Sequence, residues 1–172
     1  THCCIIDPGY EAGKILSQVE DMGLTVEAIA LTHGHFDHVG AVAEIAAETD
    51  CHVYISAADL SLPPMITNGR LYYTQTYPGT GSLSAAGLTF RVIPTPGHTP
   101  GSVCLVCEDV MFSGDTLFCG SCGRTDLPGG NPAQIRDSLR VLAALPGNFR
   151  VYPGHGSSTE LNWEREHNPY MQ

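Results

Sequence analysis

The segment that decides the fold is Thr32-His33-Gly34-His35-Phe36-Asp37-His38, which directly follows the apolar run 28–31. Three imidazoles and one carboxylate fall within six residues here. Three imidazoles this close would repel one another if protonated, and nitrogen and carboxylate donors at this spacing are typical of a metal site. We expect the run 28–31 to be a short buried strand, and the loop 32–40 to aim these side chains into one cavity.

Three further segments place a polar residue directly after a glycine, at the end of an expected strand. These segments are Gly97-His98, Gly114-Asp115 and Gly154-His155, after strands expected over 88–93, 110–113 and 150–152. Glycine lets the backbone turn sharply and come close to an ion. Four such strand ends in one small chain together predict a shared metal centre.

The remaining pattern mixes short strands and helices, which permits a layered α/β fold forming one domain over 1–172. Further strands are expected over 3–6, 51–55 and 102–107, the last forming a hairpin with 110–113, and helices over 12–22, 41–49 and 133–145. In the last helix Ile135, Leu139 and Leu142 face inward. The region 61–81, rich in Pro, Tyr and Gly, is expected to be irregular. Ser157 and Glu160 predict a capping box that opens a final helix.

Composition excludes some classes of function. The 172 residues carry a net charge of −10 with a single lysine, Lys14, so binding to nucleic acid through phosphate neutralisation is not expected. No apolar stretch is long enough to span a bilayer, so no membrane partner is expected. The first residue is Thr rather than Met, and we expect the true start of the chain to lie upstream.

Seven cysteines, an odd number, predict free thiols and a cytoplasmic location. Cys104 and Cys107 lie three apart in an expected strand and would point to opposite faces, so they cannot chelate one ion together. Cys119 and Cys122 lie in a glycine-rich loop that we expect near the metal centre.

On these motifs the chain resembles the metallo-β-lactamase superfamily, from Ile5-Ile6-Asp7-Pro8-Gly9 to the C-terminus. The resemblance implies an αββα sandwich with its metal site at one edge of the sheets, here lacking the first N-terminal strands of the family. It implies two divalent ions, with zinc favoured over iron or manganese. By this resemblance the ligands are His33, His35 and His98 for the first ion, and Asp37, His38 and His155 for the second, with Asp115 bridging the two. Asp7 is implied to support the ligands from behind.

The resemblance also implies an activity. Two ions about 3.5–4 Å apart can share a water and lower its pKa, giving a bridging hydroxide that Asp37 would orient. The segment Cys122-Gly123-Arg124 resembles the glutathione-facing loop of glyoxalase II, and the tail 164–169 is similar to that of short bacterial glyoxalase II-like proteins. The implied enzyme is a thioesterase for S-D-lactoylglutathione or a related small-molecule thioester. Arg124 would grip a substrate carboxylate, or would instead pair with Asp126 or a loop carbonyl.

Two alternatives remain at this stage. Persulfide dioxygenases of the same superfamily share the C-G-R-T-D sequence of 122–126 and hold one iron, here through His33, His98 and Asp115. The Gly154-His155-Gly156 segment looks more like the hydrolase version. A binding module with a degenerate site is disfavoured because all seven ligand positions are filled. The other histidines, His2, His52 and His167, are expected to be structural or on the surface.

Overall fold

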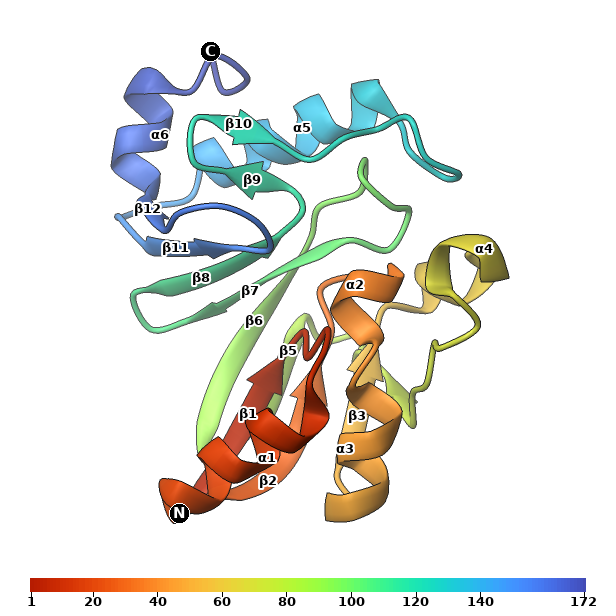
Figure 1. The fold of residues 1–172 in the computed structure, drawn as a ribbon. Helices are drawn as coiled ribbons and strands as arrows, with labels where there is room; N and C mark the ends of the chain where they lie inside the picture. Colours follow the sequence, from red (N-terminus) through yellow and green to blue (C-terminus); the bar gives the residue numbers. More distant parts are fainter.

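A computed structural model describes residues 1–172 as four layers, in the order helices, sheet, sheet, helices (Figure 1). The first sheet is parallel and has the order β1-β2-β3-β4. Its strands are β1 (His2–Ile6), β2 (Thr25–Ala30), β3 (His52–Ile55) and β4 (Gln75–Thr76). The helices α1 (Ala12–Asp21) and α3 (Val42–Thr49) cover its outer face.

The second sheet has six strands in the order β12-β11-β8-β7-β6-β5, and only β8 and β11 pair in parallel. Its strands are β5 (Ser82–Ala85), β6 (Leu88–Pro94), β7 (Val103–Cys107), β8 (Val110–Gly114), β11 (Arg150–Pro153) and β12 (Thr159–Glu160). The helices α5 (Pro132–Ala143) and α6 (Leu161–His167) lie on the side away from the first sheet (Figure 1).

Three separate apolar cores hold the four layers together, one at each interface. On β2, Val26 and Ile29 face the core beneath α1 and α3, whereas Ala28 and Ala30 face the core between the two sheets. The third core lies between the second sheet and α5, where Ile135, Leu139 and Leu142 are buried as predicted. The two faces of a strand such as β2 therefore enter different cores, and the predicted αββα sandwich is confirmed.

The cysteines also follow the predicted alternation. Cys104 is buried in the core beneath α5, whereas Cys107 packs against the core between the sheets, so the two thiols lie on opposite faces of β7. All seven cysteines are free. No helix combines the length and the apolar character that crossing a membrane requires.

Several local predictions differ from the structure. The predicted loop 32–40 contains a short helix, α2 (Phe36–Val39), and the region predicted as irregular contains α4 (Pro64–Thr67) and β4 after a 3-10 helix, η1 (Ala57–Ser61). The capping-box prediction was wrong. Thr159 and Glu160 pair with β11 and are therefore extended, so the helix begins only at Leu161, and the Glu160 side chain makes no capping bond.

Candidate metal centre

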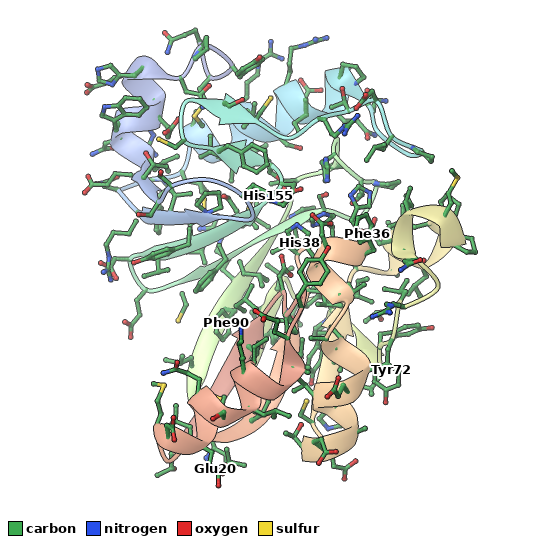
Figure 2. The ribbon with its side chains drawn as sticks, in the orientation of Figure 1. Glu20, Phe36, His38, Tyr72, Phe90 and His155 are labelled. Atoms are coloured by element: carbon green, nitrogen blue, oxygen red, sulfur yellow. The ribbon has the colours of Figure 1, made fainter.

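The seven predicted ligands come from four strand ends that meet at one edge of the two sheets. His33 and His35 follow β2, Asp37 and His38 lie on α2, and the loops after β6, β8 and β11 carry the remaining three, His98, Asp115 and His155. Figure 2 shows His38 on α2 beside His155, and their ring centroids are 5.4 Å apart. The predicted convergence of distant loops is therefore present in the structure.

Asp115 lies at the centre of this cluster. One of its carboxylate oxygens, Oδ2, lies 3.2 Å from Nε2 of His98 and 3.4 Å from Nε2 of His155, and the other, Oδ1, lies 3.2 Å from Nε2 of His38. His33 Nε2 is 3.8 Å from Oδ2. A single carboxylate thus faces histidines from both predicted ligand sets, which is the geometry a bridging ligand requires.

Three groups of donor atoms are close enough to hold a cation, with the donors of each group within 4.8 Å of one another. The groups are His33 with His35 and His98, Asp37 with His38 and His155, and Asp7 with His33 and His38. The first two coincide with the two ligand sets that the family resemblance implied. The third group shares His33 and His38 with them, and in it Asp7 stands behind the histidines.

Hydrogen bonds on the outer side of three of the rings, those of His33, His38 and His98, point one nitrogen of each inward. His38 Nδ1 donates to Asp7 (2.7 Å), and His98 Nδ1 donates to the Arg124 carbonyl (2.7 Å). Thr32 donates its hydroxyl proton to Asp7, so its oxygen is free to accept from His33 Nδ1 (3.0 Å). With Nδ1 engaged in this way, Nε2 is the atom of each of these three rings that can ligate a metal once it carries no proton.

The inward atoms lack partners within the protein. His33 Nε2, His35 Nε2, His38 Nε2 and Asp115 Oδ1 are buried and make no hydrogen bond. A buried polar atom without a partner costs about 1–3 kcal/mol, so a cluster of four calls for a ligand at this place. Nitrogen and oxygen donors without thiolates fit zinc, iron or manganese, and the residues present therefore fit a cation centre.

The electrostatics of the site point the same way. Burial lowers the pKa of His35 to about 4, and burial together with repulsion from His38 lowers the pKa of His33 well below its ordinary value. Burial would also lower the pKa of His38, but the Asp115 carboxylate 3.2 Å away and the hydrogen bond to Asp7 raise it to about 10. Without a cation, a proton on His38 offsets the surrounding carboxylates. A bound cation would supply that positive charge instead.

Asp7 and Thr32 form the support behind the site. Besides His38, Asp7 accepts hydrogen bonds from the backbone amide (2.7 Å) and the hydroxyl of Thr32. The backbone of Asp7 has a φ of 49°, a conformation that a residue with a side chain adopts only under constraint. The following Gly9 packs so closely on α2 that a Cβ there would overlap the Asp37 carbonyl.

Asp59 joins two of the ligand loops, a role that no sequence pattern indicated. The side chain is fully buried and accepts from the amides of Gly34 (2.9 Å) and Gly101 (2.6 Å) and from the Thr99 hydroxyl (2.9 Å). It thereby ties the loop of His33 and His35 to the loop of His98. A lone aspartate before an irregular region resembles any surface acid, so only the fold reveals the connection.

A cavity of about 600 Å³ opens onto the cluster. Its floor includes His35, Asp37, His98, Asp115 and His155, and its walls come from α2, α4 and the loop 118–127. This volume is large enough for a small-molecule substrate.

Arg124, the predicted substrate-binding residue, lies at this cavity, but its guanidinium is paired with Asp126. Nε lies 2.6 Å from Oδ1 and Nη2 lies 2.8 Å from Oδ2.

The C-terminal helix α6 fixes one wall of the cavity. The buried Glu164 accepts from the Gly120 amide (3.1 Å) and from the side chain of Asn168 (2.7 Å), which also donates to the Ser121 carbonyl (3.0 Å). These bonds anchor the hairpin of β9 (Leu117–Phe118) and β10 (Ser121–Cys122). The tail 164–169 therefore supports the cavity from outside.

The three histidines outside the predicted ligand set lie exposed at the surface, as expected: His2, His52 and His167.

Three solved structures with a similar fold share 32% to 40% sequence identity with this chain. A structure described as the BLEG-1 B3 metallo-beta-lactamase matches with a TM-score of 0.90 and 35% identity, over 99% of this chain and 88% of that one. A structure of TTHA1623 in a di-iron-bound form matches with a TM-score of 0.85 and 40% identity, over 96% of this chain and 87% of that one. The structure of ETHE1 from Myxococcus xanthus matches with a TM-score of 0.85 and 32% identity, over 98% of this chain and 73% of that one.

Curated sequences give the same grouping. The chain is 38% identical to the probable metallo-hydrolase YqgX of Bacillus subtilis, over 98% of this chain and 87% of that protein. It is 41% identical to a hydroxyacylglutathione hydrolase of Albidiferax ferrireducens over 90% of this chain, which spans 58% of that relative's length. The model of the metallo-beta-lactamase superfamily matches residues 1–155. With its fold, its histidine and aspartate cluster and these relatives, the chain belongs to the metallo-beta-lactamase superfamily.

Proposed function

We propose that this protein is a thioester hydrolase that uses two divalent metal ions, zinc being favoured, to cleave S-D-lactoylglutathione or a related thioester. The observation that carries the proposal is the position of the Asp115 carboxylate between two separate groups of donors at the floor of an open cavity. The relatives named as hydroxyacylglutathione hydrolases support thioesters as the substrate class.

Each part of the site has a role in this reaction. Bound divalent ions would lower the pKa of a water and polarise the thioester carbonyl. Asp37 lines the cavity, and its carboxylate lies 3.0 Å from His155 Nε2, where it can accept a hydrogen bond from the attacking water and orient it. Asp7 holds His38 by its Nδ1, and the Arg124 carbonyl holds His98 in the same way. Attack breaks the carbon–sulfur bond and releases a carboxylic acid and a thiol.

The second candidate is a persulfide dioxygenase with one iron. The likeness to ETHE1 and the C-G-R-T-D sequence of 122–126 favour it. A one-iron site built from His33, His98 and Asp115 would leave Asp37, His38 and His155 without a ligand role, although these three converge within 4.8 Å. The hydrolase accounts for both groups of donors and is therefore preferred.

A comparison of two histidine variants tests the proposal. Thiol release from S-D-lactoylglutathione and from a neutral thioester is followed for the metal-loaded protein, for His155→Ala and for the exposed His52→Ala as a control. Loss of a ligand should lower kcat/KM at least about 100-fold for His155→Ala, with little change for His52→Ala. No thiol release from either ester, together with sulfite formation from glutathione persulfide that survives His155→Ala, would replace the hydrolase by the dioxygenase.

A further inference from the structure

The cavity combines a polar floor with apolar walls. The six apolar residues that line it are Phe36, Met65, Ile66, Phe118, Cys122 and Leu127. Phe36 and Met65 remain 45% and 78% exposed. Large apolar side chains that face solvent at the rim of a pocket are typical contacts for an apolar ligand. The walls therefore favour a substrate whose outer part is apolar.

Lysine and arginine side chains are nearly absent from the walls of the same cavity. Of the eight lysines and arginines in the chain, only Arg124 lines it. Two hydrogen bonds of 2.6 and 2.8 Å engage the guanidinium with the Asp126 carboxylate, in the fork geometry that a substrate carboxylate would use. The backbone of Arg124 is fixed at the metal centre because its carbonyl accepts from His98 Nδ1.

We propose that Asp126 is a specificity determinant of this cavity: by occupying the guanidinium of Arg124, it makes the site prefer thioesters whose thiol half is uncharged and apolar. The inference rests on the proposed thioester hydrolysis and narrows its substrate class. A thiol half with free carboxylates, such as glutathione, must displace Asp126 before it can form the same bidentate pair with Nε and Nη2 of Arg124. Asp126 is tethered two residues away, so it competes at a high effective concentration.

The competition is measurable although the pair is exposed. Solvent screens the attraction between Arg124 and Asp126. An exposed pair of this kind should therefore change the affinity for a carboxylate ligand by about 1.4-fold to fivefold. The effect is directional, because removing Asp126 helps only ligands that carry a carboxylate. The pair of Arg140 and Asp137 offers a matched control, since it is equally exposed, has a distance of 2.8 Å and lies outside the cavity.

Binding of two thioethers that cannot be hydrolysed tests the inference separately from catalysis. S-hexylglutathione and S-hexyl-N-acetylcysteamine share the hexyl chain, but only the first carries carboxylates. Calorimetry on the metal-loaded full chain should show that the neutral ligand binds about 1.4-fold to fivefold more tightly. In Asp126→Ala, affinity for S-hexylglutathione should rise about twofold to fivefold, with no change for the neutral ligand.

Two further variants complete the test. Asp137→Ala should leave both affinities unchanged, and adding Arg124→Gln to Asp126→Ala should abolish the gain. Equal or tighter binding of S-hexylglutathione by the unmodified protein, or an equal gain for both ligands in Asp126→Ala, would overturn the inference. Because neither ligand is cleaved, these outcomes are independent of whether the protein hydrolyses thioesters.

Discussion

Asp59 offers a sharp test of how the ligand loops are held. The variant Asp59→Ala removes the acceptor of the Gly34 and Gly101 amides, which are then buried without a partner, whereas the Thr99 hydroxyl keeps Ser102 at 2.8 Å. Each orphaned amide costs about 1–3 kcal/mol. Burial raises the pKa of Asp59, so desolvation of its carboxylate offsets part of the gain from these bonds. We therefore expect a loss of about 2–5 kcal/mol in the free energy of unfolding.

Urea unfolding of the metal-free protein, prepared with a chelator, measures this loss without a contribution from metal binding. Thr99→Val, which removes only one hydroxyl, should cost about 1 kcal/mol. Asp59→Asn retains one acceptor oxygen and should fall between the two, and Asp137→Ala on the surface should stay within about 0.5 kcal/mol of the unmodified chain. The affinity for metal should fall in Asp59→Ala, because two ligand loops lose their common anchor. A loss below about 1 kcal/mol would refute this account of Asp59.

Other features give further tests. Glu164→Ala leaves the Gly120 amide without its acceptor and removes one of the acceptors of the Asn168 side chain, so it should cost about 2–4 kcal/mol in urea unfolding and raise KM more than it lowers kcat; an unchanged KM would argue against support of the cavity wall. The exposed Cys119 should be alkylated first and Cys104 last, because the Cys104 side chain is fully buried and burial raises the pKa of its thiol to about 11; mass spectrometry of partly labelled protein decides the order. The hydrogen bond to Arg124 lowers the pKa of Asp126 to about 2, so the pair should persist above pH 4 and be lost as the pH falls through 2. An Asp126 carboxyl that titrates near its ordinary value of 3.8 by NMR would contradict the pairing.

The positions of the candidate ligands could be predicted from the sequence because each follows a strand whose apolar pattern is clear. The run 28–31 and the strands before His98, Asp115 and His155 end at one sheet edge, so their positions could be inferred without coordinates. The hairpin of β7 and β8 was equally clear, since its turn at Glu108-Asp109 separates two apolar runs.

Contacts between distant residues were not predictable in the same way. The two amides that donate to Asp59 belong to Gly34, 25 residues before it, and to Gly101, 42 residues after it. No local sequence pattern encodes such a pairing. The S-x-x-E pattern at Ser157 and Glu160 indicated a helix start, but strand pairing with β11 took Thr159 and Glu160 instead. In both cases tertiary hydrogen bonds decided the outcome over local propensity.

The metal content of the purified protein shows how many ions the Asp115 cluster holds. Elemental analysis of the unmodified chain and of His155→Ala, on samples whose protein concentration is measured independently, gives the number of ions per chain. Two donor groups sharing Asp115 predict two ions in the unmodified chain and one in the variant. A single ion in both would contradict a two-metal site.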